Sequence, residues 1–265
     1  MPELPDVEVY KQYIDATSLH QKISSVSVRD SRIARNFNGS QMDEWLKGKT
    51  LEKTARHGKH LFILAGDDVW MMWHFGMTGA VRYLKKERKN ADYERVTFYF
   101  DNKYRLSYDA RRMLGGIQRI EGPEDFIREK GLGIDALDPA LDLDRARELL
   151  AGKRAMAKST LMKQETIAGI GNIYSDEILF QARIHPETSM DHLDAKEFST
   201  LFKTMKAVLK KAVDIRAEPS DMPATWITPR RQPGKPCPRG CGSRIQKKKV
   251  SGRSAYFCPA CQEKK

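Results

Sequence analysis

The stretch HLFILAGDDVWMMWHFGMTGAVRYL, residues 60–84, decides the fold of the N-terminal half of this 265-residue chain. Short runs rich in aromatic and branched residues alternate in it with turn signals at 66–68 and 76–79. Similar runs follow, so the strands expected lie at 60–64, 69–75, 80–84, 95–100 and 104–108. Closely spaced strands of this kind favour an antiparallel sandwich or barrel.

Helical patterns lie on both sides of these strands. Apolar residues between 7 and 14 predict an amphipathic helix that begins near Pro5 and Asp6. After about residue 142 the pattern is helical, and Asp194 with Glu197 has the spacing of a capping box. The apolar face predicted for the helix that follows comprises Phe198, Leu201, Phe202, Met205, Val208, Leu209 and Ala212. We interpret that stripe as core.

All four cysteines lie near the C-terminus, at Cys237, Cys241, Cys258 and Cys261. Two such pairs, brought together by a hairpin expected at 244–246 and 254–257, favour one structural zinc over an iron–sulfur cluster. Disulfides need an oxidising compartment, and we see no export signal and no apolar run long enough to span a bilayer. We therefore expect a cytoplasmic protein whose catalysis lies away from the zinc, because four thiolates leave no position for water.

The charge of the chain is strongly positive and uneven. Lys and Arg number 47 against 35 Asp and Glu, a net charge of +12, and residues 229–265 hold eleven basic residues and one acidic one. A segment of this density suits a polyanion such as DNA, with a solvated basic tail as the alternative. We interpret the proline-rich stretch 219–236 as a linker into the cysteine module.

The N-terminus offers nucleophilic chemistry. Removal of Met1 ahead of Pro2 is expected to leave a free secondary amine. An α-amino group has a pKa of roughly 7.7 to 8, so a useful fraction is unprotonated at neutral pH. Its attack on a sugar C1′ gives an iminium suited to eliminating phosphates, and Glu3 could protonate the sugar ring oxygen or shuttle protons.

The opening MPELPDVE at 1–8, the run GIGNIY at 169–174 and the terminal cysteine module together resemble the formamidopyrimidine-DNA glycosylase/endonuclease VIII family. The resemblance covers essentially the whole chain in the right order. It implies an α+β multidomain protein with an N-terminal antiparallel β-sandwich and leading helix, a helix–two-turns–helix domain, a linker and a zinc-finger β-hairpin. The expected bounds are 1–125, 140–218, 219–234 and 235–265.

The resemblance also implies partners and residue roles. The chain is expected to act as a monomer on double-stranded DNA with damaged bases or abasic sites, held in a cleft between lobes, and to associate with the nucleoid in a prokaryote. Pro2 is the implied nucleophile, Glu3 the general acid, Lys59 a support for β-elimination and Arg253 a support for δ-elimination. The implied DNA-binding residues are Met77, Arg111, Arg112, Met113, Arg154, Lys158 and Asn172.

Among these, Met77, Arg111 and Met113 resemble the side chains that fill the hole left by a flipped nucleotide. The turn at Asn172 opens a helix, where backbone amides and the amide side chain are expected to hold a phosphate. The resemblance is imperfect: Asp6 stands where the family usually has glutamate, Met113 replaces a phenylalanine, and an extra residue, Leu114, follows it.

The implied activity is base excision followed by β,δ-elimination. The stretch from 217 to 237 is shorter than in family members that excise 8-oxoguanine, which leaves formamidopyrimidines or oxidised pyrimidines as expected lesions. One alternative is a non-catalytic binder of damaged DNA on the same scaffold, although Pro2, Glu3 and Lys59 argue against it. Another is a zinc-ribbon component of a transcription or translation assembly, which leaves the first 180 residues unexplained.

Overall fold

The computed structural model describes residues 2–88 and 92–265, so Met1 and its expected removal lie outside the described residues. The chain divides into two compact units. Unit 1 comprises Met1–Pro2 and Asp6–Gly131, and unit 2 comprises Glu3–Pro5 and Leu132–Lys265. Helix α1 (Leu4–Thr17) therefore starts with residues of unit 2 and continues into unit 1.

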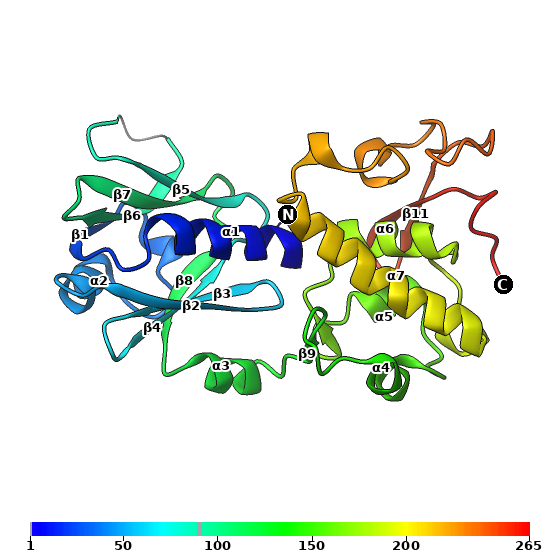
Figure 1. The fold of residues 1–265 in the computed structure, drawn as a ribbon, viewed down its shortest axis with the longest axis horizontal. Helices are drawn as coiled ribbons and strands as arrows, with labels where there is room; N and C mark the ends of the chain where they lie inside the picture. The colour runs from blue at the N-terminus through cyan, green and yellow to red at the C-terminus, as the bar shows by residue number, and fades with distance from the viewer. Residues whose placement is uncertain (1, 89–91) are drawn as a thin grey trace. The chain divides into compact units, whose positions relative to one another are not determined.

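Two four-stranded antiparallel sheets form the described part of unit 1 (Figure 1). The first has the order β1 (Ile23–Val28), β6 (Glu94–Phe100), β7 (Tyr104–Ala110), β5 (Gly79–Lys85). The second has the order β2 (Leu51–His57), β3 (His60–Ala65), β4 (Val69–His74), β8 (Gly116–Ile120). The remaining helices are α2 (Gly39–Leu46) and α3 (Pro123–Glu129). The antiparallel sandwich predicted from the sequence is confirmed.

Aromatic side chains from both sheets fill the core of unit 1. Trp73 of β4 is fully buried and stacks on Phe98 of β6, with 5.3 Å between ring centroids. Tyr108 of β7 meets the same indole edge-on at 5.6 Å. Such large side chains dominate core energetics, which explains why the aromatic runs of the sequence mark the inner strands so clearly.

Unit 2 is mainly helical. Its helices are α4 (Leu143–Leu150), α5 (Ala157–Leu161), α6 (Asn172–Ala182) and α7 (Ala195–Asp214). A parallel pair of short strands joins β9 (Ile134–Asp135) to β10 (Ile167–Ala168). The predicted capping box is confirmed at the start of α7, where Asp194 and Glu197 each accept a hydrogen bond from the other's backbone N–H. The predicted apolar face of α7 is buried apart from Phe202, which is partly buried.

The C-terminal region departs from the sequence prediction in two places. The hairpin consists of β11 (Gln246–Val250) and β12 (Arg253–Phe257), so the first arm expected at 244–246 is wrong in position. Arg244 instead forms an isolated bridge with Pro236. Within 219–236, two short 3-10 helices, η3 (Pro219–Asp221) and η4 (Thr228–Arg230), flank buried Trp226 and Ile227, so this segment packs onto unit 2.

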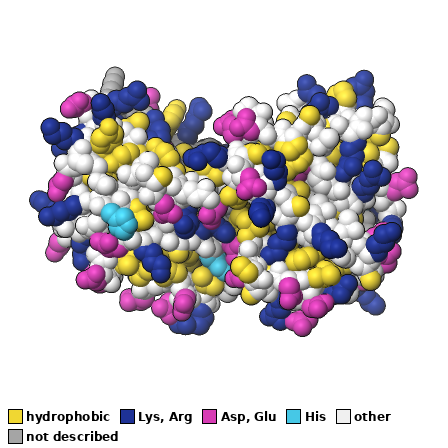
Figure 2. All heavy atoms as spheres, viewed as in Figure 1, with side chains coloured by type: hydrophobic (Ala, Val, Ile, Leu, Met, Phe, Trp, Pro, Cys, Tyr) yellow, Lys and Arg dark blue, Asp and Glu magenta, His cyan; other side chains and the backbone are white. Residues whose placement is uncertain are grey.

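Charged side chains are spread rather than gathered into one patch on the face seen in Figure 2, where Asp and Glu lie among Lys and Arg. No helix in the described part of the chain is long and apolar enough to cross a membrane.

Candidate active site

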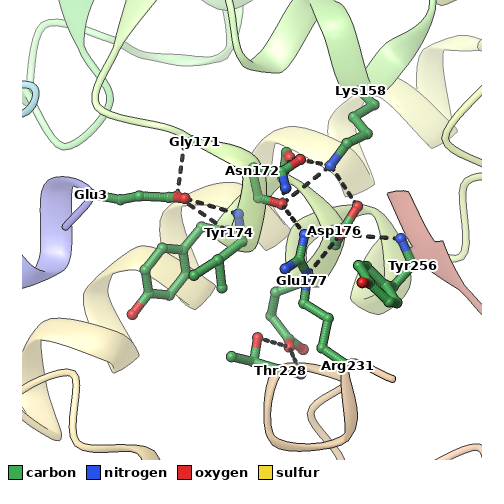
Figure 3. Close-up of polar contacts among 12 residues, drawn as sticks. Glu3, Lys158, Gly171, Asn172, Tyr174, Asp176, Glu177, Thr228, Arg231 and Tyr256 are labelled. Carbon is green, nitrogen blue, oxygen red and sulfur yellow. Dashed lines mark hydrogen bonds and ion pairs between the residues drawn. The ribbon is translucent and has the colours of Figure 1, made fainter. Parts of the chain in front are cut away.

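The carboxylate of Glu3 lies at the N-terminus of helix α6 and is fully buried. It accepts hydrogen bonds from the backbone N–H groups of Gly171 (2.8 Å) and Tyr174 (3.2 Å) on one oxygen, and of Ile173 (2.8 Å) on the other (Figure 3). The first N–H groups of a helix lack partners within the helix and carry partial positive charge. They therefore hold the Glu3 side chain in one orientation.

The glycines of the run at 169–174 are explained by the same close contact with the N-terminal segment. A Cβ atom on Gly171 would overlap the carboxyl group of Glu3. Gly169 has a φ of +115°, and a Cβ there would lie 2.5 Å from a methyl group of Leu4. Both positions thus need glycine because the N-terminal segment passes directly against them.

This arrangement corrects the expectation that the backbone amides at the Asn172 turn hold a phosphate. The N–H groups of Gly171, Ile173 and Tyr174 donate to Glu3 instead. The side-chain oxygen of Asn172 is buried and has no hydrogen-bond partner among the described residues. Direct contact of the Asn172 side chain with DNA stays a prediction.

The predicted DNA contact of Lys158 stays a prediction, and the structure places this residue inside unit 2. This side chain is fully buried, and its ammonium donates to Asp176 (2.6 Å), Ser175 (2.9 Å) and the carbonyl of Asn172 (3.2 Å). All three donors of the ammonium are therefore used inside unit 2. Burial lowers the pKa of Lys158 and raises the pKa of Asp176, and their ion pair opposes both shifts.

Asp176 joins three separate segments of unit 2, a feature that the sequence did not reveal. Besides Lys158 of α5, it accepts hydrogen bonds from Arg231 (2.8 Å) and from the backbone N–H of Tyr256 on β12 (3.1 Å). The Arg231 guanidinium lies over the Tyr256 ring, 4.5 Å from its centroid. Arg231 lies in the segment that the sequence suggested was only a linker, so nothing in the pattern marked it.

Glu177, on the same helix, anchors that segment. One of its carboxylate oxygens accepts from the backbone N–H (2.8 Å) and the hydroxyl (2.6 Å) of Thr228. Burial raises the pKa of Glu177, and the bonds from Thr228 oppose this shift. The segment is therefore fixed to α6 at two points, Thr228 and Arg231.

The four cysteines predicted to hold a metal come together. Their sulfur atoms all lie within 4.8 Å of one another, with 3.8 Å between Cys237 and Cys261 and 3.5 Å between Cys241 and Cys258. Tetrahedral zinc with Zn–S bonds of about 2.3 Å separates its sulfurs by roughly 3.8 Å, so the cluster fits one zinc ion. Bound zinc would tie the hairpin together and leave no position for substrate.

Two of the predicted basic residues of unit 2 are exposed. Arg253 begins β12, just after the hairpin turn in which Ser251 and Gly252 both have positive φ. It lines a cavity of about 400 Å³ with residues that include Lys153 and Ser159. Arg154 is 94 % exposed, and its nearest acidic partner is Asp191 at 3.9 Å. Contact of both side chains with DNA phosphates stays a prediction.

In unit 1 the predicted contact residues lie on two loops that touch each other. Met77, in the β4–β5 turn, is 41 % exposed, and Arg111 and Arg112 are exposed after β7. The backbone N–H of Arg112 donates to the hydroxyl of Thr78 (3.0 Å), which joins the two loops. Arg111 lies over the ring of Tyr93 at 5.4 Å.

The apolar side chain at the tip of the second loop differs from the predicted one. Met113 has a φ of 54° and packs, partly buried, against the core of unit 1. Leu114 is 50 % exposed, the largest exposure among the large hydrophobic residues of the described chain. Leu114 is therefore more exposed than Met113 in this loop, and the DNA contact expected of Met113 stays a prediction.

Lys59 lies in the tight turn between β2 and β3, next to paired His57 and His60. The His60 ring packs between His74 (5.3 Å) and Phe126 (5.2 Å). Burial, with a smaller contribution from His74, lowers the pKa of His60 to about 3. Pro2 is partly exposed. No pattern in the sequence singled out these histidines.

Comparison with known proteins agrees with this geometry along the whole chain. Residues 1–117 match the formamidopyrimidine-DNA glycosylase N-terminal domain, 132–223 its H2TH domain, and 234–264 the zinc finger found in FPG and IleRS. A formamidopyrimidine-DNA glycosylase of Pelotomaculum thermopropionicum is 32 % identical over 279 residues, which cover all of both chains. The chain belongs to the formamidopyrimidine-DNA glycosylase family.

Solved structures of this glycosylase family show the same fold. A complex of the Lactococcus lactis protein LlFpg with THF-DNA and an inhibitor has a TM-score of 0.89 at 30 % identity, covering 99 % of this chain and all of that one. A complex between a mutant of the Lactococcus lactis Fpg and Fapy-dG-containing DNA has a TM-score of 0.88 at 31 % identity, with the same coverage. The chain is therefore a base-excision-repair DNA glycosylase with a helix–two-turns–helix domain and one structural zinc site.

Proposed function

We propose that this glycosylase removes formamidopyrimidine lesions or oxidised pyrimidines and then cuts the strand by β,δ-elimination from a Schiff base on Pro2. The observation that carries the proposal is the position of the Glu3 carboxylate at the N-terminus of helix α6. A carboxylate held by three backbone N–H groups directly follows the proline whose amine would attack. Positioning of this kind supports general acid–base catalysis beside a nucleophile.

Water is the only further reactant that the chemistry needs, because it hydrolyses the final iminium and frees the Pro2 amine. The unprotonated Pro2 nitrogen bonds to C1′ as the C1′–N bond to the damaged base breaks, and the ring-opened sugar becomes an iminium. A secondary amine gives an iminium with no N–H to lose, so its positive charge persists. Loss of a C2′ proton then expels the 3′ phosphate, and a second elimination expels the 5′ phosphate. Glu3 would donate and accept protons at the sugar.

Phosphate and base-stack contacts would come from the exposed loops. Lys59 and Arg253 would bind the phosphates that leave, with Arg112 and Arg154 adding sequence-independent affinity. Met77, Arg111 and Leu114 would occupy the gap left by the flipped nucleotide, since apolar tips flanked by cations insert between bases. The segment 219–236 packs onto unit 2, which supports the expectation that no long loop covers 8-oxoguanine.

Borohydride trapping tests this proposal. The duplexes would carry an abasic site, a formamidopyrimidine, an oxidised pyrimidine or 8-oxoguanine, and peptide mapping would locate the adduct. We expect the adduct on Pro2, with the first three duplexes trapping faster than 8-oxoguanine. Pro2→Gly should lower trapping by at least about 100-fold with DNA affinity retained, because the imine of a primary amine can lose its charge.

Pro233→Gly, at an exposed position of the 219–236 segment, serves as the matched control and should trap like the parent enzyme. Absence of any adduct from protein that still binds DNA would favour a non-catalytic binder. An adduct on a lysine would overturn the assignment of the nucleophile.

A further inference from the structure

The peptide group between Asn172 and Ile173 connects two cations, buried Lys158 and partly buried Arg231, to Glu3. Its carbonyl oxygen accepts hydrogen bonds from Lys158 (3.2 Å) and from Arg231 (3.1 Å). Its N–H donates to Glu3 at 2.8 Å. Figure 3 shows these side chains converging on the first turn of α6 from different sides.

We propose that Lys158 and Arg231 are positioning residues that act on Glu3 through the Asn172–Ile173 peptide group, with Asp176 holding both cations on its carbonyl. This inference rests on the proposed function, because it assigns a purpose to residues around the predicted general acid. It replaces the DNA-contact role expected for Lys158 and gives Arg231 a role in the site.

The physical basis is polarisation within a buried hydrogen-bond chain. Positive charge at a carbonyl oxygen draws electron density from the amide nitrogen, so the N–H of the same peptide becomes a stronger donor. Hydrogen bonds in such chains strengthen one another, by roughly 10–30 % per bond. The cations are kept on the carbonyl because Asp176 binds Lys158 with one oxygen (2.6 Å) and Arg231 with the other (2.8 Å).

The charges around Glu3 give the direction of the effect. The charged groups on the surrounding elements include Lys158 on α5, Asp176 on α6 and Arg231 after η4, together with the expected amine of Pro2. Glu177 also lies on α6 but binds Thr228. Removing one cation would weaken the Ile173 donor and withdraw a positive charge. The Glu3 carboxylate would then be held less firmly at the start of α6, and base excision would slow.

The experiment compares Lys158→Met, Arg231→Met and Lys210→Met, an exposed lysine on α7 that controls for the loss of one charge. Single-turnover base excision would be measured at one pH, with Glu3→Gln giving the rate without the predicted general acid. We expect the rate to fall by about threefold to tenfold in the first two variants and to stay unchanged in Lys210→Met.

Two further measurements separate this proposal from its rivals. The amide proton of Ile173 should shift upfield by NMR in both variants, a readout that does not need catalysis. The salt slope of DNA binding should be unchanged in Lys158→Met, whereas loss of a phosphate contact would lower it by about one. A lower slope with an unmoved Ile173 resonance would show that Lys158 contacts DNA and overturn the proposal.

Folding is expected to survive each change, because Asp176 keeps one cationic partner. Should Lys158→Met fail to fold, the more accessible Arg231→Met decides, and an unchanged excision rate with an unmoved Ile173 resonance overturns the proposal. Trapping of Pro2 in the parent enzyme keeps the two hypotheses apart. Normal trapping with an unchanged excision rate in the variants refutes only the peptide-mediated effect, whereas a parent enzyme without a Pro2 adduct refutes the proposed function.

Discussion

The two loops of unit 1 and the start of helix α6 in unit 2 use basic residues in opposite ways. Arg111 and Arg112 are exposed at the ends of loops, beside apolar Met77 and Leu114. Lys158 is buried and saturated by acceptors. Family resemblance suggested DNA contacts in both places. A basic residue that matches a position of the family therefore has the same charge as its counterpart. Its exposure, and so its role, depends on the residues that the rest of the chain places around it.

The largest expected effect on stability comes from removing the charge of Asp176, the anion that Lys158 and Arg231 share. Asp176→Asn keeps the shape of the side chain but leaves Lys158 and Arg231 without their shared anion. Uncompensated buried charge typically costs about 3–5 kcal/mol, so the free energy of unfolding should fall by that order. Urea denaturation followed by circular dichroism measures it. Asp191→Asn, near exposed Arg154, is the control and should leave the midpoint unchanged; an equal effect there would contradict the comparison.

On the exposed loop after β7, the neighbouring residues Leu114 and Met113 are expected to differ in their roles. Leu114→Ala should slow excision from duplex DNA by about tenfold or more, because flipping a nucleotide costs a few kcal/mol that an inserted side chain offsets. Cleavage at an abasic site in single-stranded DNA, where no stack is opened, should change little. Met113→Ala should instead lower stability by about 1 kcal/mol through lost packing. The reverse pattern would return the wedge role to Met113.

A smaller effect concerns His60, a partly buried titratable group of unit 1. The unfolded chain binds a proton at this position below about pH 6.5, whereas the folded chain does so only near pH 3, the lowered pKa of His60. Stability should therefore decrease as the pH falls, by about 1.5 kcal/mol between pH 6.5 and 5. His60→Gln should remove this part of the pH dependence in urea titrations, and exposed His20→Gln should not. Equal slopes for both variants would argue against burial of a neutral His60.

Sequence patterns predicted the inner strands and missed the polar ones. The strands around Trp73 and Phe98 were recognised because both flanking sheets bury aromatic side chains. β1 (ISSVSV) and β2 (LEKTARH) were not predicted, because their serines and charged residues obscure the alternation of apolar and polar residues that marks a strand. β11 (QKKKV) is mostly exposed, so its lysines resembled a loop and the hairpin was expected too early.

The residues of the candidate site also fall into those that the sequence predicted and those that it did not. The cysteine spacing was sufficient to predict the metal cluster, because its ligands are close in sequence and chemically specific. The burial of Lys158 depends on Asp176, eighteen residues away, and on Arg231, which no local pattern connects to it. The choice between Met113 and Leu114 depends on how one extra loop residue turns the backbone, which spacing alone does not determine.

The contact between Glu3 and Gly171 has a consequence for how this family changes over generations. The two residues are 168 positions apart, yet a methyl group on one would occupy the space of the other's carboxyl group. A methyl group at 171 would therefore displace the Glu3 carboxyl group from the backbone N–H groups that hold it. We expect glutamate at 3 and glycine at 171 to be retained together, so that they are inherited as a single character.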